Sequence, residues 1–221
     1  MSNIEVTYVD HMGTDLPVAN AARVSFGKKS EMDSSDPWGP PFLKVKDAKL
    51  IRYLAKHKHI SPFGHCFASF HIKAPVFVAR QLVKHKFLRW NEISRRYVDS
   101  EPEFYVPNQW RGRSENKKQG SAGVVDVLHD VEHLSSMMVN LYNDLIEEGV
   151  CPEQARMVLP QSMMTEWYWS GSLDAFADMC KLRCADDTQA ETRDVAEYIA
   201  GEMYELFPVS WEALVEIEHE R

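Results

Sequence analysis

Apolar and polar residues alternate in three stretches of the chain, which predicts short β-strands over residues 4–9, 66–73 and 163–169. A fourth short strand is predicted over residues 103–106. We therefore expect a small, mostly antiparallel sheet.

Apolar residues spaced by three and four along the chain predict that helices outnumber strands. The clearest pattern runs from Val124 to Leu145, and it predicts one long helix over residues 122–148 with Gly149 as its C-cap. This helix is either a buried core helix or the seam of a coiled coil, and both alternatives fit packing against a partner subunit. Shorter helices are predicted over residues 15–24, 45–57, 75–86, 152–156, 173–182, 188–206 and 211–219.

Local signals support the starts of three of these helices. Asp15 is suited to cap the first helix, and Pro75 fits the first turn of the helix that it begins. Thr188 and Glu191 have the spacing of a capping box.

Two segments rich in glycine, serine and charged residues, 27–41 and 111–121, have no hydrophobic period and are predicted to be loops. A loop as long as the first one is often a lid or a binding loop when it lies inside a compact domain. No repeat or break in composition divides the chain. The sequence therefore predicts a single α+β domain over residues 1–221, with the small sheet packed by several helices.

Composition narrows the class of protein. Hydrophobic residues make up 44% of the 221 residues, which excludes a disordered chain, and no apolar run is long enough to span a bilayer. The first residues lack the basic and apolar regions of a secretion signal, so we expect a cytoplasmic protein (in the host cytoplasm if the source is a virus) with no membrane partner. A net charge of -8 argues against general nucleic-acid binding, although not against a local basic site.

The four cysteines, Cys66, Cys151, Cys180 and Cys184, are too few and too scattered for a disulfide framework in a chain of this length. Cys180 and Cys184 lie one helical turn apart, which leaves a zinc pair as a weak alternative. The sequence has no Cys-x-x-Cys motif, so we expect reduced thiols and no metal site.

Residues 80–96, here called the basic segment, contain six lysines and arginines plus His85 against one acid, Glu92. Cations are favoured at a helix C-terminus, which explains Lys84 and Lys86 but not the arginines that follow. Guanidinium and ammonium groups close together are suited to binding phosphate. From charge alone, the basic segment either binds a phosphorylated ligand or forms a solvated basic surface.

The basic segment also carries a motif. Lys84-His85-Lys86, seven further residues and then Ser94 resemble the signature of the flavin-dependent thymidylate synthases, in which Arg-His-Arg is followed by seven residues and a serine. Further similar residues occur in the family's order along almost the whole chain. They are Ala22 to Phe26, His59, Ser61 to His65, Phe70 to Pro75, Ala79 to Gln81, Asn91, Glu92, Arg96, Tyr97, Glu103 to Pro107, Ala155, Arg156, Leu159, Pro160, Leu182, Arg183, Gln189 and Glu191.

The resemblance implies an enzyme that converts dUMP to dTMP. FAD, reduced by NADPH, would supply the hydride and methylenetetrahydrofolate would supply the carbon. The family resemblance also implies a homotetramer with active sites at subunit interfaces, and no nucleic-acid partner.

The resemblance also implies roles for individual residues. Arg183 would be the catalytic arginine, which contacts the pyrimidine and favours loss of its N3 proton, and Arg156 would reach the nucleotide from a neighbouring subunit. The residues implied to bind the substrate are Gln81, Leu82, Val83, Lys84, Glu92, Ile93, Ser94, Arg95, Arg96, Arg156 and Arg183. Those implied to bind the cofactor are Ser25, His59, Ser61, Lys84, His85, Lys86, Glu92, Ser172, Asp174 and Asp178.

The sequence departs from the family pattern at several of these positions. Lys84 and Lys86 replace two arginines, which keeps the charge but loses bidentate geometry. Gly64 replaces a glutamate and Asp187 a histidine. At the implied flavin contacts, Asn, Arg and Asn are replaced by Ser172, Asp174 and Asp178. Asp174 in place of an arginine is unfavourable beside the anionic FAD unless the adenine end of FAD lies elsewhere.

Two other functions remain as alternatives. The basic segment could serve a nucleic-acid-binding module in which Trp90 and Tyr97 stack on bases. The chain could also be a relative that binds flavin and nucleotide but has weakened turnover. Residues 167–169, Trp-Tyr-Trp, are either part of the core or a shelf for the flavin.

Overall fold

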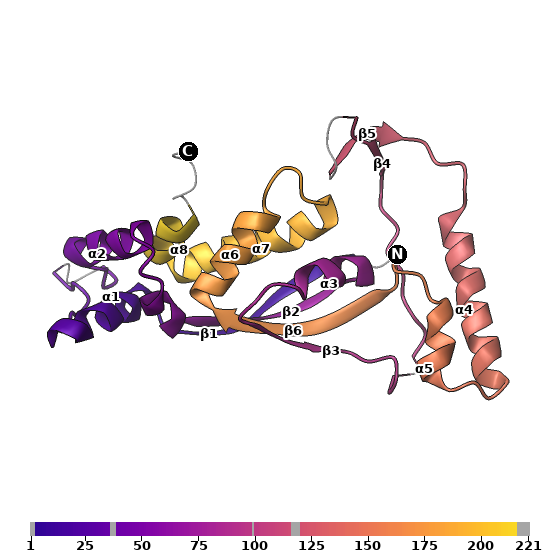
Figure 1. Ribbon diagram of the computed structural model, residues 1–221, viewed down its shortest axis with the longest axis horizontal. Helices are drawn as coiled ribbons and strands as arrows, with labels where there is room; N and C mark the ends of the chain where they lie inside the picture. The colour runs from indigo at the N-terminus through magenta and orange to yellow at the C-terminus, as the bar shows by residue number, and fades with distance from the viewer. Residues whose placement is uncertain (1–2, 36–38, 99, 116–119, 216–221) are drawn as a thin grey trace.

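Four strands form an antiparallel sheet at the centre of the protein, in the order β1-β2-β6-β3. The computed structural model describes residues 3–35, 39–98, 100–115 and 120–215 (Figure 1). The strands are β1 (Glu5–Met12), β2 (Phe67–Pro75), β3 (Leu88–Glu92) and β6 (Met164–Ser172). β1, β2 and β6 confirm the three strands predicted from alternation. None of the predicted strands corresponds to β3. Its five residues carry little hydrophobic periodicity, and they form a strand by pairing with β6.

The two faces of this sheet differ in polarity. Successive side chains of a strand point to opposite faces, so Phe70, Trp167 and Trp169 are buried on the inner face while Tyr168 is 52% exposed on the outer one. The ring of Trp90 stacks on Trp167 at 4.4 Å between centroids. Trp167 and Trp169 are therefore core residues, and Tyr168 points away from them.

Helices cover the inner face of the sheet and extend beyond one end of it, packing on the strands or on one another (Figure 1). They are α1 (Asp15–Arg23), α2 (Val45–Lys56), α3 (Val76–Leu82), α6 (Leu173–Arg183), α7 (Ala190–Leu206) and α8 (Pro208–Val215). α6 packs on the sheet through Phe176, which meets Trp169 edge to face at 5.6 Å between ring centroids. Figure 1 shows no helix against the outer face within the described part of the chain.

The roles predicted for three residues at helix starts are wrong, although the first helix does begin at Asp15, and in two cases side chains expected to cap their own helix bind other parts of the chain. Asp15 is the first residue of α1, and its carboxylate accepts hydrogen bonds from the backbone N–H groups of Val209 (3.0 Å) and Ser210 (2.8 Å) at the start of α8. In the predicted capping box, the Thr188 hydroxyl donates to the Leu182 carbonyl instead. Gln189 is the N-cap of α7.

The third correction concerns the helix after β2. Pro75 is the N-cap of α3 and the last residue of β2, rather than a residue of the helix. α3 ends at Leu82 instead of residue 86, so Lys84 and Lys86 lie in the turn between α3 and β3. Phe87 in this turn has a positive φ of 63°, which a helix does not allow.

An arm beside the sheet contains the helix α4 (Val131–Glu147), the short helix α5 (Pro152–Ala155) and a hairpin of β4 (Trp110–Arg113) and β5 (Ser121–Val125) (Figure 1). The hairpin contradicts both the predicted loop at 111–121 and the predicted start of the long helix at 122. The β-branched residues Val124 and Val125 pair with β4 instead of continuing the helical pattern.

The two ends of α4 have clear local causes. Asp130 caps its start by accepting a hydrogen bond from the backbone N–H of His133 at 2.9 Å. Its end is confirmed at Gly149, which has a φ of 90°, and the N–H of Val150 donates to the carbonyl of Leu145 at 2.9 Å in a Schellman motif. Leu134 and Leu141 on α4 are 49% and 41% exposed, so this helix is not buried within its own chain.

The remaining predictions are confirmed in part. The strand predicted at 103–106 is reduced to a single bridge between Phe104 and Met163. The described residues of the 27–41 loop form neither a helix nor a strand beyond a bridge from Asp33 to Phe42. α8 starts three residues before the predicted helix at 211–219, whose last four residues lie outside the described part of the chain.

The four cysteines form no disulfide, and the side chains of Cys180 and Cys184 share a hydrogen bond. Burial and, to a smaller extent, the nearby Asp15 carboxylate raise the pKa of the Cys66 thiol to about 11. The thiol of Cys180 is also buried and faces the carbonyl of Ala196 at 3.5 Å. Across the described ranges, His, Cys, Asp and Glu side chains form no group of three or more that could hold a metal ion. None of the helices in the same ranges combines the length and apolar character needed to cross a bilayer.

Candidate functional site

The side chain of Arg183 connects the C-terminal end of α6 to the end of α3. Its Nε donates to His85 Nε2 at 3.0 Å, and its Nη2 donates to the main-chain carbonyl of Gln81 at 3.1 Å. We call Gln81, His85 and Arg183 the arginine–histidine cluster. The structure therefore brings together three residues that the resemblance assigns to the site, although Arg183 is about a hundred positions after the other two in the sequence.

His85 is neutral in this cluster. Burial and, to a smaller extent, the charge of Arg183 lower the pKa of His85 to about 4, with Asp178 opposing both effects. Since Nε2 accepts a hydrogen bond from Arg183, the single ring proton belongs on Nδ1. A neutral imidazole holds the guanidinium in place without adding a competing positive charge.

We expect a histidine titration to show this directly. In proton NMR spectra of the folded protein, the ring signal of His85 should titrate near pH 4, well below the ordinary value of 6.5. Between these two values the unfolded chain binds a proton that the folded chain does not, so the free energy of unfolding should fall as the pH drops through this window. Replacing His85 by glutamine should flatten that part of the stability profile. An inflection of His85 near pH 6.5 would contradict the assigned neutral state.

A second group of site residues borders a cavity of about 270 Å³ at the far end of β3, the Glu92 cavity. The Glu92 carboxylate accepts hydrogen bonds from Trp90 Nε1 at 3.0 Å and from Thr165 Oγ1 at 2.7 Å. Arg95 lines the same cavity and donates to the carbonyl of Ser100. The remaining implied residues that line it are Ile93 and Arg156.

Two arginines beside the Glu92 cavity share one neighbour on α5. Arg96 forms an ion pair with the Glu153 carboxylate, with a nitrogen–oxygen distance of 2.5 Å, and Arg156 donates to the Glu153 carbonyl at 3.3 Å. The Ser94 hydroxyl accepts from the backbone N–H of Arg96 at 3.3 Å. An anionic ligand at this place would compete with the Glu153 carboxylate for Arg96. It would also meet the guanidinium of Arg156, which forms no ion pair with any described residue.

The other residues of the basic segment differ in exposure. Lys84 and Lys86 are both exposed in the turn after α3. Val83 is also exposed, whereas the Leu82 side chain is fully buried, so a ligand could reach only main-chain atoms of Leu82. Trp90 stacks one ring face on Trp167 and its indole N–H donates to Glu92, so only its other face could meet a base in the nucleic-acid alternative.

A third group borders a cavity of about 700 Å³ between α1, α2 and the turn at Ser61–His65, the His59 cavity. Ser25, His59 and Ser61 line it, together with Phe26 and Tyr53. The volume lies within the range of small-molecule sites.

The residues at the start of α6 are close to this turn. Asp174 Oδ1 is buried without a hydrogen-bond partner among the described residues, and a Cβ atom at Gly64 would lie 3.9 Å from it. Ser172, the N-cap of α6, is buried, whereas Asp178 is exposed and faces Lys181 at 3.5 Å. The unpartnered Asp174 oxygen is suited to a ligand that donates a hydrogen bond.

These three groups do not converge on one cavity of a single chain. Residues of α1 and α2 line the His59 cavity, and Arg156, directly after α5, lines the Glu92 cavity; these helices lie at opposite ends of the sheet (Figure 1). The arginine–histidine cluster lies between them, where α3 and α6 end.

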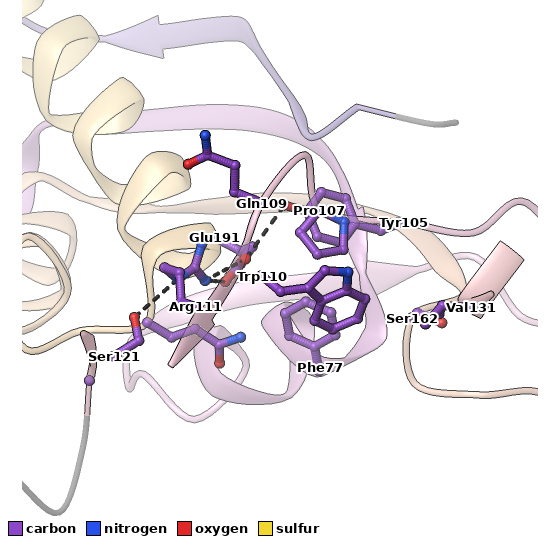
Figure 2. A pocket seen from close by; sticks show the side chains of 12 residues that line it. Phe77, Tyr105, Pro107, Gln109, Trp110, Arg111, Ser121, Val131, Ser162 and Glu191 are labelled. Carbon is purple, nitrogen blue, oxygen red and sulfur yellow. Dashed lines mark hydrogen bonds and ion pairs between the residues drawn. The ribbon is translucent and has the colours of Figure 1, made fainter. Parts of the chain in front are cut away.

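The sequence predictions missed a fourth group, around a cavity of about 530 Å³ between α3, α7 and the hairpin, the Arg111 cavity (Figure 2). Phe77, Tyr105 and Trp110 supply its aromatic lining. Arg111 Nη2 donates to both carboxylate oxygens of Glu191, at 2.6 and 2.7 Å. The segment 110–113 has a short alternation that could have indicated a strand, but no local signal pairs Arg111 with a residue so far along the chain.

Comparisons with known proteins agree with this architecture. A family model described as "Thymidylate synthase complementing protein" matches residues 7–209. A flavin-dependent thymidylate synthase of Thermus thermophilus is 38% identical over 214 residues, which cover 96% of this chain and 75% of that protein. The enzyme of the same name from Thermosipho africanus is 35% identical over 217 residues, covering 96% and 90% of the two chains.

Solved structures show the same fold. The UMP/dUMP methylase PolB from Streptomyces cacaoi, bound with 5-Br dUMP, superposes with a TM-score of 0.82 at 30% identity and covers 97% of this chain and 96% of its own. The PolB structure with 5-Br UMP gives a TM-score of 0.83 at 29% identity, with 98% and 96% covered. The α+β fold is thereby confirmed, and the chain belongs to the family of thymidylate synthase complementing proteins, the flavin-dependent thymidylate synthases.

Proposed function

We propose that this protein is a flavin-dependent thymidylate synthase that methylates dUMP at C5 of the uracil ring to give dTMP. The family and its named members support the reaction, and PolB, similar over nearly its whole length, is crystallised with a dUMP analogue. Within the chain, the observation that carries the proposal is the guanidinium of Arg183, held by neutral His85 and the Gln81 carbonyl beside the Lys84–Lys86 motif.

The chemistry explains why a fixed arginine is needed. Methylation at C5 requires electron density on that carbon, and a cation beside N3 and O4 of the ring stabilises the negative charge that develops there. Arginine stays charged and offers a planar set of donors. Two of its N–H groups are already used to hold it in place. The remaining donors are available to the pyrimidine.

None of the residues that the resemblance assigns to substrate binding is a cysteine, although the half-buried Cys184 thiol, next to Arg183 in the sequence, has a pKa lowered by its hydrogen bond with Cys180. The thiols of Cys66 and Cys180 are buried, and burial raises the pKa of both. The Ser94 hydroxyl accepts a hydrogen bond from the Arg96 backbone, as expected for a group that positions a substrate. This arrangement supports activation of the pyrimidine by ring polarisation rather than by covalent attack.

The phosphate of dUMP is assigned to the arginines beside the Glu92 cavity. Arg96 and Arg156 are close to the same residue, Glu153, so a phosphate that displaces its carboxylate gains two charge-assisted contacts. The resemblance assigns Arg156 to the site of a neighbouring subunit, so Arg96 and Arg156 of one chain would bind the phosphate of a nucleotide whose ring lies at Arg183 of another.

The residues present fit FAD as the cofactor. The His59 cavity has room for part of a dinucleotide, and the buried acceptor oxygen of Asp174 suits a ribose hydroxyl or the adenine amino group, but not a phosphate. Ser25, His59 and Ser61 would hold the cofactor from one side and Ser172 and Asp174 from another. When bound, FAD supplies the hydride, which NADPH provides as reductant, and methylenetetrahydrofolate supplies the carbon.

A homotetramer is part of the same proposal. The implied site residues are divided among three places of one chain, so a complete site requires more than one subunit. The outer face of the sheet and the exposed apolar residues of α4 are surfaces that other copies could cover.

The function is tested by release of tritium from dUMP labelled at C5. Purified protein supplied with FAD, NADPH and methylenetetrahydrofolate should release tritium and form dTMP, and omission of methylenetetrahydrofolate should abolish dTMP formation. The protein should also be yellow, with flavin absorbance that NADPH bleaches. Yellow protein that binds dUMP without product would identify a relative with weakened turnover. Colourless protein without dUMP binding would overturn the proposal.

A further inference from the structure

A chain of hydrogen bonds leads from the hairpin to the arginine–histidine cluster. It begins at the Arg111 cavity, where Arg111 Nη2 contacts both oxygens of Glu191 (Figure 2). Glu191 is only 4% exposed, in the first turn of α7. Burial alone would raise the pKa of Glu191, but the hydrogen bonds from Arg111 and Gln189 outweigh it and the net shift is downward. Glu191 is therefore a carboxylate, which can only accept hydrogen bonds.

This carboxylate determines the orientation of two side-chain amides. The side chain of Gln189 also helps to lower the pKa of Glu191, and only its NH₂ group can donate to a carboxylate, so its oxygen faces the other way. Gln189 Oε1 then accepts from Gln81 Nε2 at 2.7 Å. Because the NH₂ group of Gln81 is used in this contact, its Oε1 atom is left as an acceptor, and no described residue donates to it. Gln81 is the residue whose main-chain carbonyl holds Arg183.

We propose that Glu191 is a positioning residue for nucleotide binding, which acts through Gln189 to keep the side-chain oxygen of Gln81 available to the substrate. The inference rests on the proposed function, because it takes Gln81 as a contact of dUMP. An acceptor at Gln81 favours a nucleotide that donates a hydrogen bond at this place, as the ribose hydroxyl does. Arg111 contributes by holding Glu191 charged and in place.

The Glu191→Gln substitution removes the cause of this orientation while keeping the shape of the side chain. A glutamine at 191 can face Gln189 with either an oxygen or an NH₂ group. The side-chain amides of Gln189 and Gln81 can then each rotate by half a turn. Gln81 would then present a donor to the substrate for part of the time. We expect the dissociation constant of dUMP to rise about three- to tenfold, the effect of losing one hydrogen bond.

The experiment is a double-mutant cycle in the FAD-loaded protein, with the dissociation constant of dUMP measured by calorimetry. Glu191→Gln is made in the wild type and in a Gln81→Leu background, and Gln189→Leu is made in both as well. The matched control is Glu197→Gln, the same change on an exposed position of α7, where the carboxylate pairs only with Arg193 among the described residues. The control should bind dUMP like the wild type.

The expected result is that Glu191→Gln and Gln189→Leu each weaken binding in the wild type and change it less than about 1.5-fold when Gln81 is leucine. An equal loss in both backgrounds would show a general structural effect and overturn the proposal, as would wild-type affinity of Glu191→Gln. If Glu191→Gln does not unfold cooperatively, that variant is not properly folded and is left out. The test then uses Gln189→Leu in both backgrounds, since Gln189 is exposed. Wild-type protein that binds no dUMP would instead overturn the proposed function, and the inference with it.

Discussion

Replacing Arg183 by alanine is expected to lower the rate of dTMP formation by about 10²–10³-fold, the usual loss when one stabilising donor is removed from a transition state. The protein should remain folded and flavin-bound, because Arg183 is a partly exposed residue at the end of α6. The measurement is single-turnover dTMP formation with saturating dUMP, which separates the chemical step from binding. The pKa of His85 should rise in the same variant, since the charge of Arg183 contributes to lowering it.

Two further variants identify the cause of such a loss. Arg183→Lys keeps a positive charge but not the planar set of donors, so its rate should lie between wild type and alanine. Arg193→Ala removes a guanidinium from α7 that pairs with Glu197 and should leave the rate unchanged. Wild-type turnover of Arg183→Ala would remove this residue from the reaction.

The largest effect on stability is expected at Asp15. Its two carboxylate oxygens accept hydrogen bonds from the N–H groups of Val209 and Ser210 in the first turn of α8, and Asp15 itself is 7% exposed. Asp15→Ala leaves these donors without their acceptor, which should lower the free energy of unfolding by about 2–4 kcal/mol. Urea or thermal unfolding at a fixed protein concentration measures this loss.

Asp144→Ala is the matched control for Asp15, because Asp144 is an exposed aspartate within a helix. Its free energy of unfolding should change by less than about 0.5 kcal/mol. Asp15→Asn should lie between the two, since an amide keeps one acceptor oxygen but loses the charge. Equal stability of Asp15→Ala and Asp144→Ala would show that the contact between α1 and α8 contributes nothing.

The candidate site was only partly accessible to prediction. The family motif identified Gln81, His85 and Arg183, and the structure joins them by hydrogen bonds. The motif could not indicate that Arg183 is held by a neutral histidine, because the pKa of His85 depends on burial and on a charge from another helix. Nothing in the sequence pointed to Arg111 as a site residue, because the short alternation of residues 110–113 gives no sign of its distant partner Glu191.

Strands β1, β2 and β6 and helices α2, α6 and α7 follow from the sequence by itself, because each carries its own hydrophobic period. Gly149 likewise ends α4 through a conformation that glycine adopts without strain. The family membership is also indicated by the order of its motifs.

Only the tertiary structure decided the features whose partners are far apart in the chain. β3 becomes a strand by pairing with β6, and residues 121–125 leave the helical pattern to pair with β4. Asp15 caps α8 rather than α1, and Glu191 binds Arg111 rather than acting in a capping box with Thr188. In each case a hydrogen bond to a distant donor or acceptor outweighs a local preference, since local preferences are worth about 1 kcal/mol and a buried polar group must find a partner.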